Sequence, residues 1–389
     1  MIYLDYAATT PMSEEAMEVF IQASKNFYGN ANSLHDIGSN AANLLEASRE
    51  ELAKLLHCQK EGIYFTSGGS ESNILAITSL ISANKHRGNH LITTKCEHSS
   101  ILHLFQRLEQ EGYEVTYLPV NQSGFVDLAA LQNAVKDTTI LVAIQHANSE
   151  IGTIQHINKI GKLLHERNVL FHCDAVQSFG KIPLHLDQEY IDSLSISSHK
   201  VYGPKGVGAV YINPRRKWNP QIPGSTHEGG LRPGTINIPG IAAFVTAATA
   251  IYDTMERENA RLEALRELLI EKLTQLPTAK VVIEGDQRKH LPNIVGIRII
   301  GMEGQLVMLE CNRYGIALST GSACSIGMQE PSSTLKALGR SDMEAKQFIR
   351  ISLGNATTKA DILHTIAIMN NVTESFFNKT RRETIGYEG

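Results

Sequence analysis

The stretch "SISSHKVYGPKGVGAV" (residues 195–210) begins as a strand-like run and breaks, after His199 and Lys200, into a turn rich in Gly and Pro. Ligands of open α/β sheets bind at the carboxyl ends of the strands, so a lysine directly after a strand is well placed for chemistry. Lys205, inside Gly-Pro-Lys-Gly, is expected to point to solvent. The segment 206–212 follows without an intervening helix, so we expect it to pair antiparallel in the same sheet.

The same pattern recurs along the chain. The predicted strands are "GIYF" (62–65), "HLITT" (90–94), "TILVAIQ" (139–145), "NVLFHCD" (168–174) and "SLSIS" (193–197), with amphipathic helical stretches between them. This alternation predicts an α/β fold with a mostly parallel sheet covered on both faces. Each strand is followed by a polar cluster, in order "TSGGSESN", "KCEHSS", "HANSEIG", "DAVQS" and "SHK". The carboxyl edge of the sheet is therefore the predicted functional site.

A second α/β unit follows a long helical stretch near 241–276. It contains "NIVGIRII", "EGQLVMLECNRYG", "FIRISLG" and a final helix near 358–376. We predict a large ligand-binding domain over 16–258 and a smaller domain formed by 1–15 and 259–389.

Composition limits the possible partners. The formal net charge is −4 and no basic block is present, which argues against nucleic acid or an anionic membrane as a main partner. No secretory signal is visible at the N-terminus, and the apolar stretch 238–252 is expected to be a buried helix. The five cysteines are scattered without a CxxC motif, which favours free thiols in a reducing cytoplasm and predicts no metal site.

Three of the polar clusters suggest parts of a ligand site. Backbone N–H groups at Gly69 and the Ser70 hydroxyl could bind one small phosphate, although an ordinary capped turn fits this motif equally well. Asp174 follows an apolar strand and needs a cationic partner, which a protonated ring nitrogen would supply, with Gln177 one turn further on; a helix-capping role is the alternative. His98 could stack on an aromatic ligand and move protons, or be a satisfied loop histidine.

Together these clusters predict a ligand with one phosphate, one ring nitrogen that needs an acid, and one aldehyde that needs an amine. Pyridoxal 5′-phosphate has these three groups, and proteins bind it with a Schiff-base lysine and an Asp at the pyridinium nitrogen. Lys200 is the predicted lysine.

Nine segments make a more specific resemblance. They are "LDYAATTP", "FTSGGSESN", "CEHSSI", "HANSEIG", "HCDAVQSFGK", "SSHKVYGPKGVGA", "HEGGLRPGT", "STGSACS" and "IRISLG". In this order they resemble the pyridoxal-phosphate-dependent cysteine desulfurases of the NifS/IscS group, in the class V aminotransferase family, from Tyr3 to about Thr358. The resemblance implies the fold-type-I architecture of these transferases, with a seven-stranded, mostly parallel sheet in the large domain.

The resemblance also implies roles for individual residues. Lys200 would bind the cofactor covalently beside His199, and His98 would stack on the ring as an acid/base. The other implied cofactor contacts are Gly69, Ser70, Ser197 and His199 at the phosphate, Asp174 at the ring nitrogen and Gln177 at the 3′-oxygen. Thr235 would reach the phosphate of a second subunit, which implies a homodimer.

The implied substrate is L-cysteine, with its carboxylate on Arg350 and its sulfur transferred to Cys324. The products would be L-alanine and a persulfide on Cys324, whose sulfur passes to an acceptor protein or an iron–sulfur scaffold; a transient role of Cys324 as a cluster ligand is compatible with this. The physiological acceptor and activity on selenocysteine are not defined by the sequence.

The chain departs from the family pattern at two places. Gly69-Ser70 replaces Ala-Thr, and a serine hydroxyl can still hold phosphate. The family's "NNEIG" becomes "NSEIG", so the asparagine that contacts cofactor and substrate aligns with Ser149. Either Asn148 takes over that contact or the contact is weaker here.

The choice of thiol rests on sequence context. Cys324 lies among small residues in "TGSACSIG", which predicts an accessible loop. Cys173 and Cys311 lie in apolar contexts typical of packing thiols, and Cys58 and Cys96 are undecided.

Other functional classes fit less of the sequence. A class V transaminase acting on serine or alanine would share Lys200 and Asp174 but has no need of a cysteine in "STGSAC". A non-enzymatic sulfur carrier would leave the five polar strand ends unexplained. A metal site on residues 172–174 is excluded because adjacent strand side chains point to opposite faces.

Overall fold

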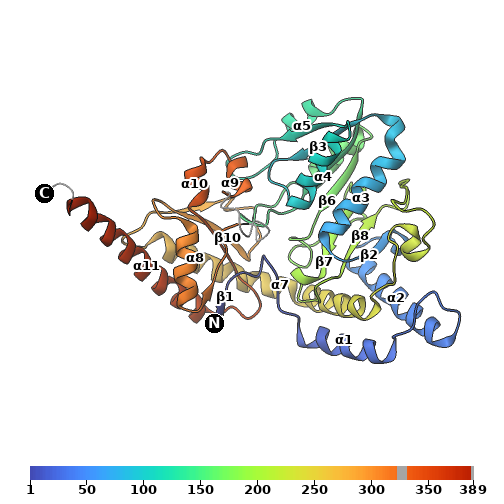
Figure 1. The fold of residues 1–389 in the computed structure, drawn as a ribbon, viewed down its shortest axis with the longest axis horizontal. Helices are drawn as coiled ribbons and strands as arrows, with labels where there is room; N and C mark the ends of the chain where they lie inside the picture. The colour runs from blue at the N-terminus through green and yellow to red at the C-terminus, as the bar shows by residue number, and fades with distance from the viewer. Residues whose placement is uncertain (322–330, 387–389) are drawn as a thin grey trace.

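The computed structural model describes residues 1–321 and 331–386, with side chains to residue 379. Within this described part, a seven-stranded sheet of order β2-β8-β7-β6-β5-β3-β4 forms the centre of the larger half of the molecule (Figure 1). Its strands are β2 (Ile63–Thr66), β3 (His90–Thr94), β4 (Glu114–Leu118), β5 (Thr139–Gln145), β6 (Leu170–Asp174), β7 (Ser193–Ser197) and β8 (Gly208–Ile212).

Strand direction brings the polar loops to one edge. β4, β3, β5, β6 and β7 are parallel, whereas β8 is antiparallel to both β7 and β2, so β2 runs in the same direction as β7. The antiparallel strand predicted over 206–212 is thus confirmed. β4 did not stand out in the sequence, because it is an edge strand in which only Leu118 is buried.

Helices cover both faces of this sheet. They are α1 (Glu14–Asn26), α2 (Asp36–Leu55), α3 (Gly69–Asn84), α4 (Ser99–Gln110), α5 (Leu128–Ala134), α6 (Ile157–Glu166) and α7 (Ile238–Thr274), with 3₁₀ turns η1 (Lys60–Gly62), η2 (Lys85–Arg87), η3 (Ser198–Lys200) and η4 (His227–Gly230). Along β5, Val142 and Ile144 pack in one core with α2, α5, α6 and α7, while Leu141 and Ala143 pack in the other with α3 and α4. The strand is therefore buried on both sides, as its continuous apolar run predicts.

The smaller half contains an antiparallel sheet of order β12-β10-β9 and a parallel pair of β1 with β11. Its elements are β1 (Ile2–Tyr3), β9 (Val281–Glu284), β10 (Ile294–Ile299), β11 (Ile316–Ala317), β12 (Phe348–Ser352), α8 (Gly304–Arg313), α9 (Ser333–Ala337), α10 (Asp342–Lys346) and α11 (Lys359–Gly386). Leu4 packs in the same core as Ile297 and Ile351, so the start of the chain belongs to this half. α11 extends away from the body of the molecule (Figure 1).

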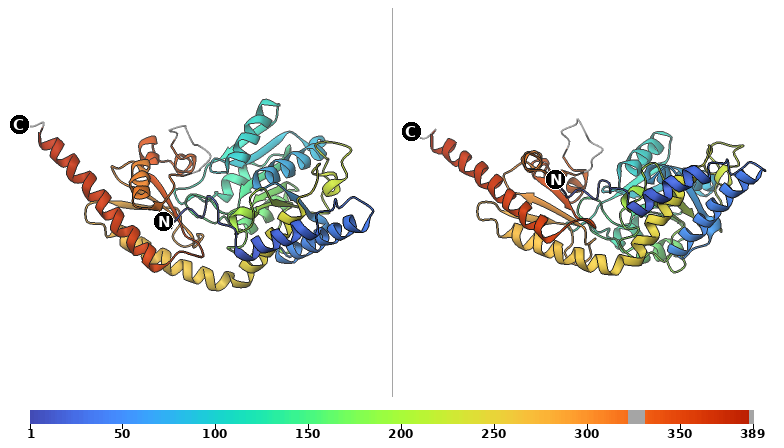
Figure 2. Two further views of the ribbon diagram at one scale, coloured as in Figure 1. Left: turned by 60° about the horizontal axis from the view of Figure 1, so that its bottom comes forward. Right: turned by 90° about the horizontal axis from the view of Figure 1, so that it is seen from below.

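The long helix α7 connects the two halves (Figure 2). Ile241 and Phe244 near its start pack in the large core, and Leu265 and Leu269 pack in the small one. Between Ala248 and Leu262 no residue of α7 is buried, and the proposed domain boundary at 258/259 lies in this interval. By length and composition α7 could cross a membrane, but half of its most apolar window is buried inside the protein, as in a core helix.

Candidate active site

The predicted strand-end residues converge at the carboxyl edge of the large sheet. Asp174 is the last residue of β6, η3 with Lys200 follows β7, α3 starts after β2, and His98 caps α4 after β3. The side chain of Asn73 on α3 contacts Asp174 at 2.8 Å, and this contact links α3, the helix that follows β2, to the end of β6. The edge is thus a connected polar site.

Lys200 lies at the centre of this site. Its Nζ donates hydrogen bonds to the carbonyl oxygens of Ala7 (2.6 Å) and Ala8 (2.7 Å). A second lysine, Lys181, donates to the carbonyl oxygens of Gln177 (3.0 Å) and Lys200 (3.4 Å). Burial, reinforced by the charge of Lys200, lowers the pKa of Lys181 to about 7. Lys205 is exposed, as predicted, so Lys200 is the better-placed amine for covalent chemistry.

The turn before α3 has the features of an anion cradle. α3 begins at Gly69 without a side-chain cap, and Gly68 has φ of +150°, which side chains rarely allow. A Cβ added at Gly69 would lie 2.5 Å from Cγ2 of Val176, and one at Gly68 would lie 3.7 Å from Oγ of Ser197. The family's alanine at position 69 would therefore crowd Val176 here. A helix N-terminus with free N–H groups favours a phosphate.

Two buried oxygens next to this cradle have no partner. In the described part of the chain, neither Oγ of Ser197 nor Oε1 of Gln177 accepts or donates a hydrogen bond. The other end of the Gln177 amide, Nε2, donates to the carbonyl oxygen of Ala7 at 2.9 Å. Unpaired buried polar atoms cost free energy, so these two indicate places where a polar ligand contributes the missing hydrogen bonds.

Asp174 is buried and held by two donors. Its Oδ1 accepts from the backbone N–H of Val176 (3.0 Å), and its Oδ2 accepts from Nδ2 of Asn73 (2.8 Å). Each carboxylate oxygen can accept a further hydrogen bond. Asp174 can thus bind a protonated ring nitrogen while it stays fixed at the end of β6.

The two histidines of the site are both biased to the neutral form. Burial, with a contribution from the charges of Lys200 and His103, lowers the pKa of His98, whereas Asp174 acts in the opposite direction. Burial and the neighbouring Lys200 lower the pKa of His199 to about 4, and its Nδ1 lies 3.1 Å from the hydroxyl of Thr9. A neutral imidazole carries one N–H that can give a proton and one lone pair that can take one, which suits His98 for proton transfer.

Arg350, on β12, faces this edge from the smaller half. Its Nη2 donates to Oδ1 of Asp5 (2.7 Å) and its Nη1 to the carbonyl oxygen of Ser149 (3.1 Å). Arg350 is almost fully buried, and its Nε has no hydrogen-bond partner among the residues described. Asp5 and the carbonyl of Ser149 therefore hold the guanidinium in place, and its remaining N–H donors can bind a carboxylate.

The side chain of Asn148 is engaged at both ends, its oxygen by its own turn and its nitrogen by Cys96 and Thr334. Its Oδ1 accepts from the backbone N–H groups of Glu150 (2.9 Å) and Ile151 (3.0 Å), and its Nδ2 donates to the carbonyl oxygen of Cys96 (3.2 Å). A cofactor contact by Asn148 remains a prediction, and the side chain would have to give up part of this network to make it.

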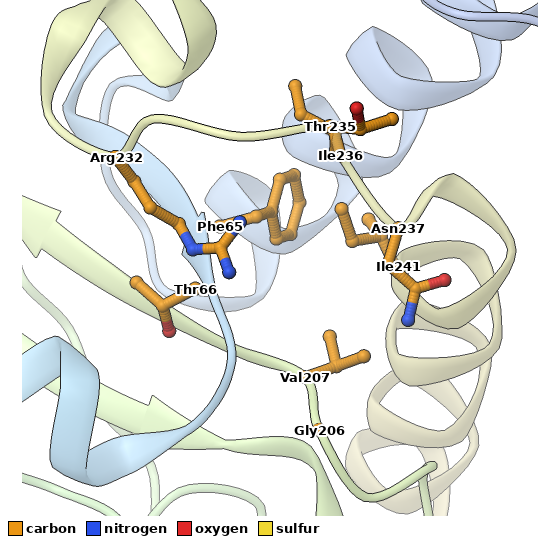
Figure 3. A pocket seen from close by; sticks show the side chains of 9 residues that line it. All are labelled: Phe65, Thr66, Gly206, Val207, Arg232, Thr235, Ile236, Asn237 and Ile241. Carbon is orange, nitrogen blue, oxygen red and sulfur yellow. The ribbon is translucent and has the colours of Figure 1, made fainter.

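Thr235 is exposed and lines a pocket whose lining does not include Lys200. The pocket's lining residues are Phe65, Thr66, Gly206, Val207, Arg232, Thr235, Ile236, Asn237 and Ile241 (Figure 3). Its arginine, Arg232, is paired with Glu71 on α3 at 2.9 Å. Because a partner subunit would supply the second half of any shared site, the role of Thr235 remains a prediction. Cys324 lies outside the described residues, so its assignment also remains a prediction.

The N-terminal segment has a larger part in the site than the sequence suggested. Ala7 and Ala8 accept from Lys200, Asp5 pairs with Arg350, and Thr10 accepts from the backbone N–H of Tyr202 (2.8 Å).

In the sequence, "LDYAATTP" contributed to the resemblance but gave no individual role. A polar Asp5 between Leu4 and Tyr6, which are both buried, was the one available signal.

Comparison with known families supports this geometry. Residues 2–364 match the family model described as aminotransferase class-V. The chain is 48% identical over 387 residues to the putative cysteine desulfurase NifS of Bacillus subtilis, covering 98% of each chain. It is 40% identical over 383 residues to the cysteine desulfurase IscS of Clostridium botulinum, covering 98% of this chain and 95% of the relative.

Solved structures agree with the sequence relatives. A structure described as a NifS-like protein superposes with a TM-score of 0.90 at 32% identity, covering 96% of this chain and 99% of the other. A structure of SspA in complex with cysteine superposes with a TM-score of 0.80 at 32% identity, covering 91% of this chain and 99% of the other.

Proposed function

The chain belongs to the class-V aminotransferase family, and we propose that it is a pyridoxal 5′-phosphate-dependent cysteine desulfurase that converts L-cysteine into L-alanine. The observation that carries the proposal is the convergence, at one sheet edge, of Lys200, Asp174 and His98 with Arg350 from the smaller half. The cysteine desulfurases among its relatives and the structure of SspA with cysteine support the choice of substrate.

The residues at this edge fit the cofactor. The uncapped start of α3 and the orphan Oγ of Ser197 suit the phosphate, and the orphan Oε1 of Gln177 leaves a polar position to be satisfied near the ring. Asp174 would hold the ring nitrogen, and the amine of Lys200 would bind the aldehyde. When bound, pyridoxal 5′-phosphate supplies an electron sink for the negative charge that develops at the substrate's α-carbon.

The protein's own groups position the substrate and move its protons. Arg350, oriented by Asp5 and the carbonyl of Ser149, binds the α-carboxylate with its remaining N–H donors. Nζ of Lys200 accepts the α-proton and later returns a proton, for which it must leave the carbonyls of Ala7 and Ala8. His98, kept neutral by burial, exchanges a proton with the reacting sulfur.

Cys324 is the proposed sulfur acceptor. Its thiolate attacks the substrate sulfur, so an S–S bond forms while the substrate's C–S bond breaks and its electron pair goes to carbon. That carbon takes up a proton and becomes the methyl group of alanine. The two sulfurs together lose the two electrons that the carbon gains, so no external oxidant is required.

We further propose a homodimer that passes this sulfur on in the cytoplasm. Exposed apolar side chains gather on α1 and the segment leading into α2, namely Met17, Ile21, Tyr28, Leu34 and Ile37. A second copy covering this surface would bury it, and in the homodimer Thr235 would reach the partner's phosphate. The four cysteines in the described part of the chain are free thiols, in keeping with a reducing compartment. The acceptor would be a sulfur-accepting or iron–sulfur scaffold protein.

Three experiments test these proposals. Borohydride reduction followed by peptide mapping should place a pyridoxyl group on Lys200; a group on Lys181 or Lys205 instead would exclude the assignment. With L-cysteine the protein should form alanine and sulfide under reducing conditions, whereas a transaminase would form a keto acid.

Light scattering should give twice the chain mass of 42.8 kDa, and an active monomer would exclude the shared site.

A further inference from the structure

Beneath the candidate site, a chain of buried polar groups joins four secondary-structure elements. Asn73 on α3 is 1% exposed and makes three contacts. Its Nδ2 donates to Oδ2 of Asp174 (2.8 Å) and to Oγ of Ser100 (3.0 Å), and its Oδ1 lies 3.0 Å from Nε2 of His172 on β6. A single amide thus contacts the carboxylate, the turn that carries His98 and a buried histidine.

His172 fixes which way this amide points. His172 is fully buried, and burial lowers its pKa to about 3, so it stays neutral. Oδ1 of Asn73 can only accept, so Nε2 of His172 carries the proton and its Nδ1 accepts from the hydroxyl of Ser193 (2.8 Å). With Oδ1 held by His172, both N–H groups of Asn73 are directed at Asp174 and Ser100.

Ser100 transmits this arrangement to His98. Nδ1 of His98 accepts from the backbone N–H of Ser100 (3.2 Å) and lies 2.8 Å from its Oγ. The Ser100 hydroxyl accepts from Asn73, so its own proton is free to point at Nδ1. A nitrogen that accepts two donors carries no proton, which places the proton of neutral His98 on Nε2.

We propose that Asn73 is a positioning residue that holds Asp174 and, through Ser100, sets the protonated nitrogen of His98. The part that concerns Asp174 and the cofactor rests on the proposed function, while the part that concerns His98 is a property of the protein alone. Asn73 would not touch substrate; it would keep the carboxylate of Asp174 and the imidazole of His98 in one fixed geometry.

The proposal is tested with three variants. Asn73→Ala removes all three contacts, and Ser100→Ala removes only the hydroxyl between Asn73 and His98. Asn84→Ala is the matched control, because Asn84 is an amide on the same helix that bonds to Leu80 and Lys217, away from the site. Circular dichroism checks that each variant folds.

The first readout is the tautomer of His98 in cofactor-free protein labelled with ¹⁵N-histidine, assigned by the signal lost in His98→Gln. We expect an unprotonated Nδ1 in the wild type and in Asn84→Ala. In Ser100→Ala the backbone N–H of residue 100 is the one donor left on Nδ1 of the two described, and in Asn73→Ala the Ser100 hydroxyl is no longer oriented, so both variants should show a partial shift toward a protonated Nδ1. An unchanged tautomer of His98 in Ser100→Ala would overturn the link from Asn73 through Ser100 to His98. This outcome is decisive even if Asn73→Ala fails to fold.

The second readout is the dissociation constant of pyridoxal 5′-phosphate, measured by equilibrium dialysis. Loss of one hydrogen bond to a charged group should weaken binding about tenfold in Asn73→Ala, with changes below about threefold in Ser100→Ala and Asn84→Ala. Equal affinity in Asn73→Ala and Asn84→Ala would overturn the positioning of Asp174. If the wild type does not bind the cofactor, the proposed function is contradicted. The tautomer of His98 then tests by itself the part of the proposal that concerns His98.

Discussion

On the side of the site formed by the larger half of the molecule, Asp174 accepts two hydrogen bonds at 2.8 and 3.0 Å, and a buried amide and a neutral histidine lie directly behind it. On the side formed by the smaller half, Arg350 is held by Asp5 and one carbonyl oxygen and keeps a buried Nε that the described residues leave without a partner. Asp174 is thus fully supported from behind, although Oγ of Ser197 and Oε1 of Gln177 near it lack partners among the described residues, whereas Arg350 itself has unused donors.

This difference matches what each side has to bind. A cofactor that stays through every turnover is best held by groups whose geometry is fixed before it arrives. A substrate that comes and goes needs donors that it can satisfy on arrival and leave again. Changes on the side of the larger half should therefore affect cofactor binding and chemistry, and changes around Arg350 should affect substrate affinity.

Lys200→Ala should cause the largest loss. Removal of the amine that accepts the α-proton should lower kcat by at least about a thousandfold, as for other general bases. Lys205→Ala, the control, should stay within twofold because its side chain is exposed. Rates of alanine formation measure both, and similar rates for the two variants would contradict the assignment.

Arg350→Ala should act mainly on KM. Loss of the bidentate partner of the α-carboxylate should lower kcat/KM for L-cysteine about a hundredfold. Binding of cysteamine, which lacks the carboxylate, should change little. A variant that weakens both ligands equally would show that Arg350 is structural and that the comparison between the two sides is wrong.

Glu97→Gln should change how stability depends on pH. Burial raises the pKa of Glu97 to about 8, although it accepts from the Thr94 hydroxyl (2.6 Å) and the backbone N–H of Gln145 (2.7 Å). In the unfolded chain it loses its proton near 4.5, so between pH 4.5 and 8 the folded state holds a proton that the unfolded state has lost. The free energy of unfolding should fall as pH rises through this window, by about 1.4 kcal/mol per pH unit from this group.

Urea unfolding at pH 5, 6, 7 and 8 measures this contribution. The stability of Glu97→Gln relative to the wild type should increase with pH, whereas Glu166→Gln, an exposed control on α6, should give a constant difference. A constant difference for Glu97→Gln as well would mean that Glu97 is ionised in the folded protein.

Asp5→Asn should have the smallest effect. Asn keeps an oxygen for Nη2 of Arg350 but removes a negative charge that competes with the substrate carboxylate, so KM for L-cysteine should fall about threefold. Asp5→Ala, which also removes the oxygen, should raise KM instead. If both variants change KM in the same direction, Asp5 does not act through its charge.

The positions of Asp174 and Lys200 at strand ends could be predicted from the sequence because the signals are local. Asp174 and Lys200 each come at the end of an apolar strand. Polar residues at the carboxyl ends of parallel strands lie at one edge of the sheet. The antiparallel strand β8 followed from a similar local signal, the missing helix before it. The edge strand β4 gave only a weak signal because a single residue of it is buried.

The contacts that complete the site are long-range and left no such signal. The hydrogen bond from Lys200 to Ala7 spans 193 residues and uses a backbone carbonyl, which no residue type reveals. Asn73 lies in the same helix as the anticipated phosphate cradle, but its partners Asp174 and Ser100 come from β6 and α4. The occupation of Asn148 by its own turn also emerged only from the fold.

Mass spectrometry of the peptide containing Cys324, after a single turnover with L-cysteine labelled with ³⁴S, tests the central proposal most directly. The account predicts that this peptide gains one labelled sulfur atom in step with alanine formation, and that Cys324→Ala still binds pyridoxal 5′-phosphate on Lys200 but forms neither product. Labelled sulfur on any of the other four cysteines, or alanine formed by Cys324→Ala at a near wild-type rate, would contradict it.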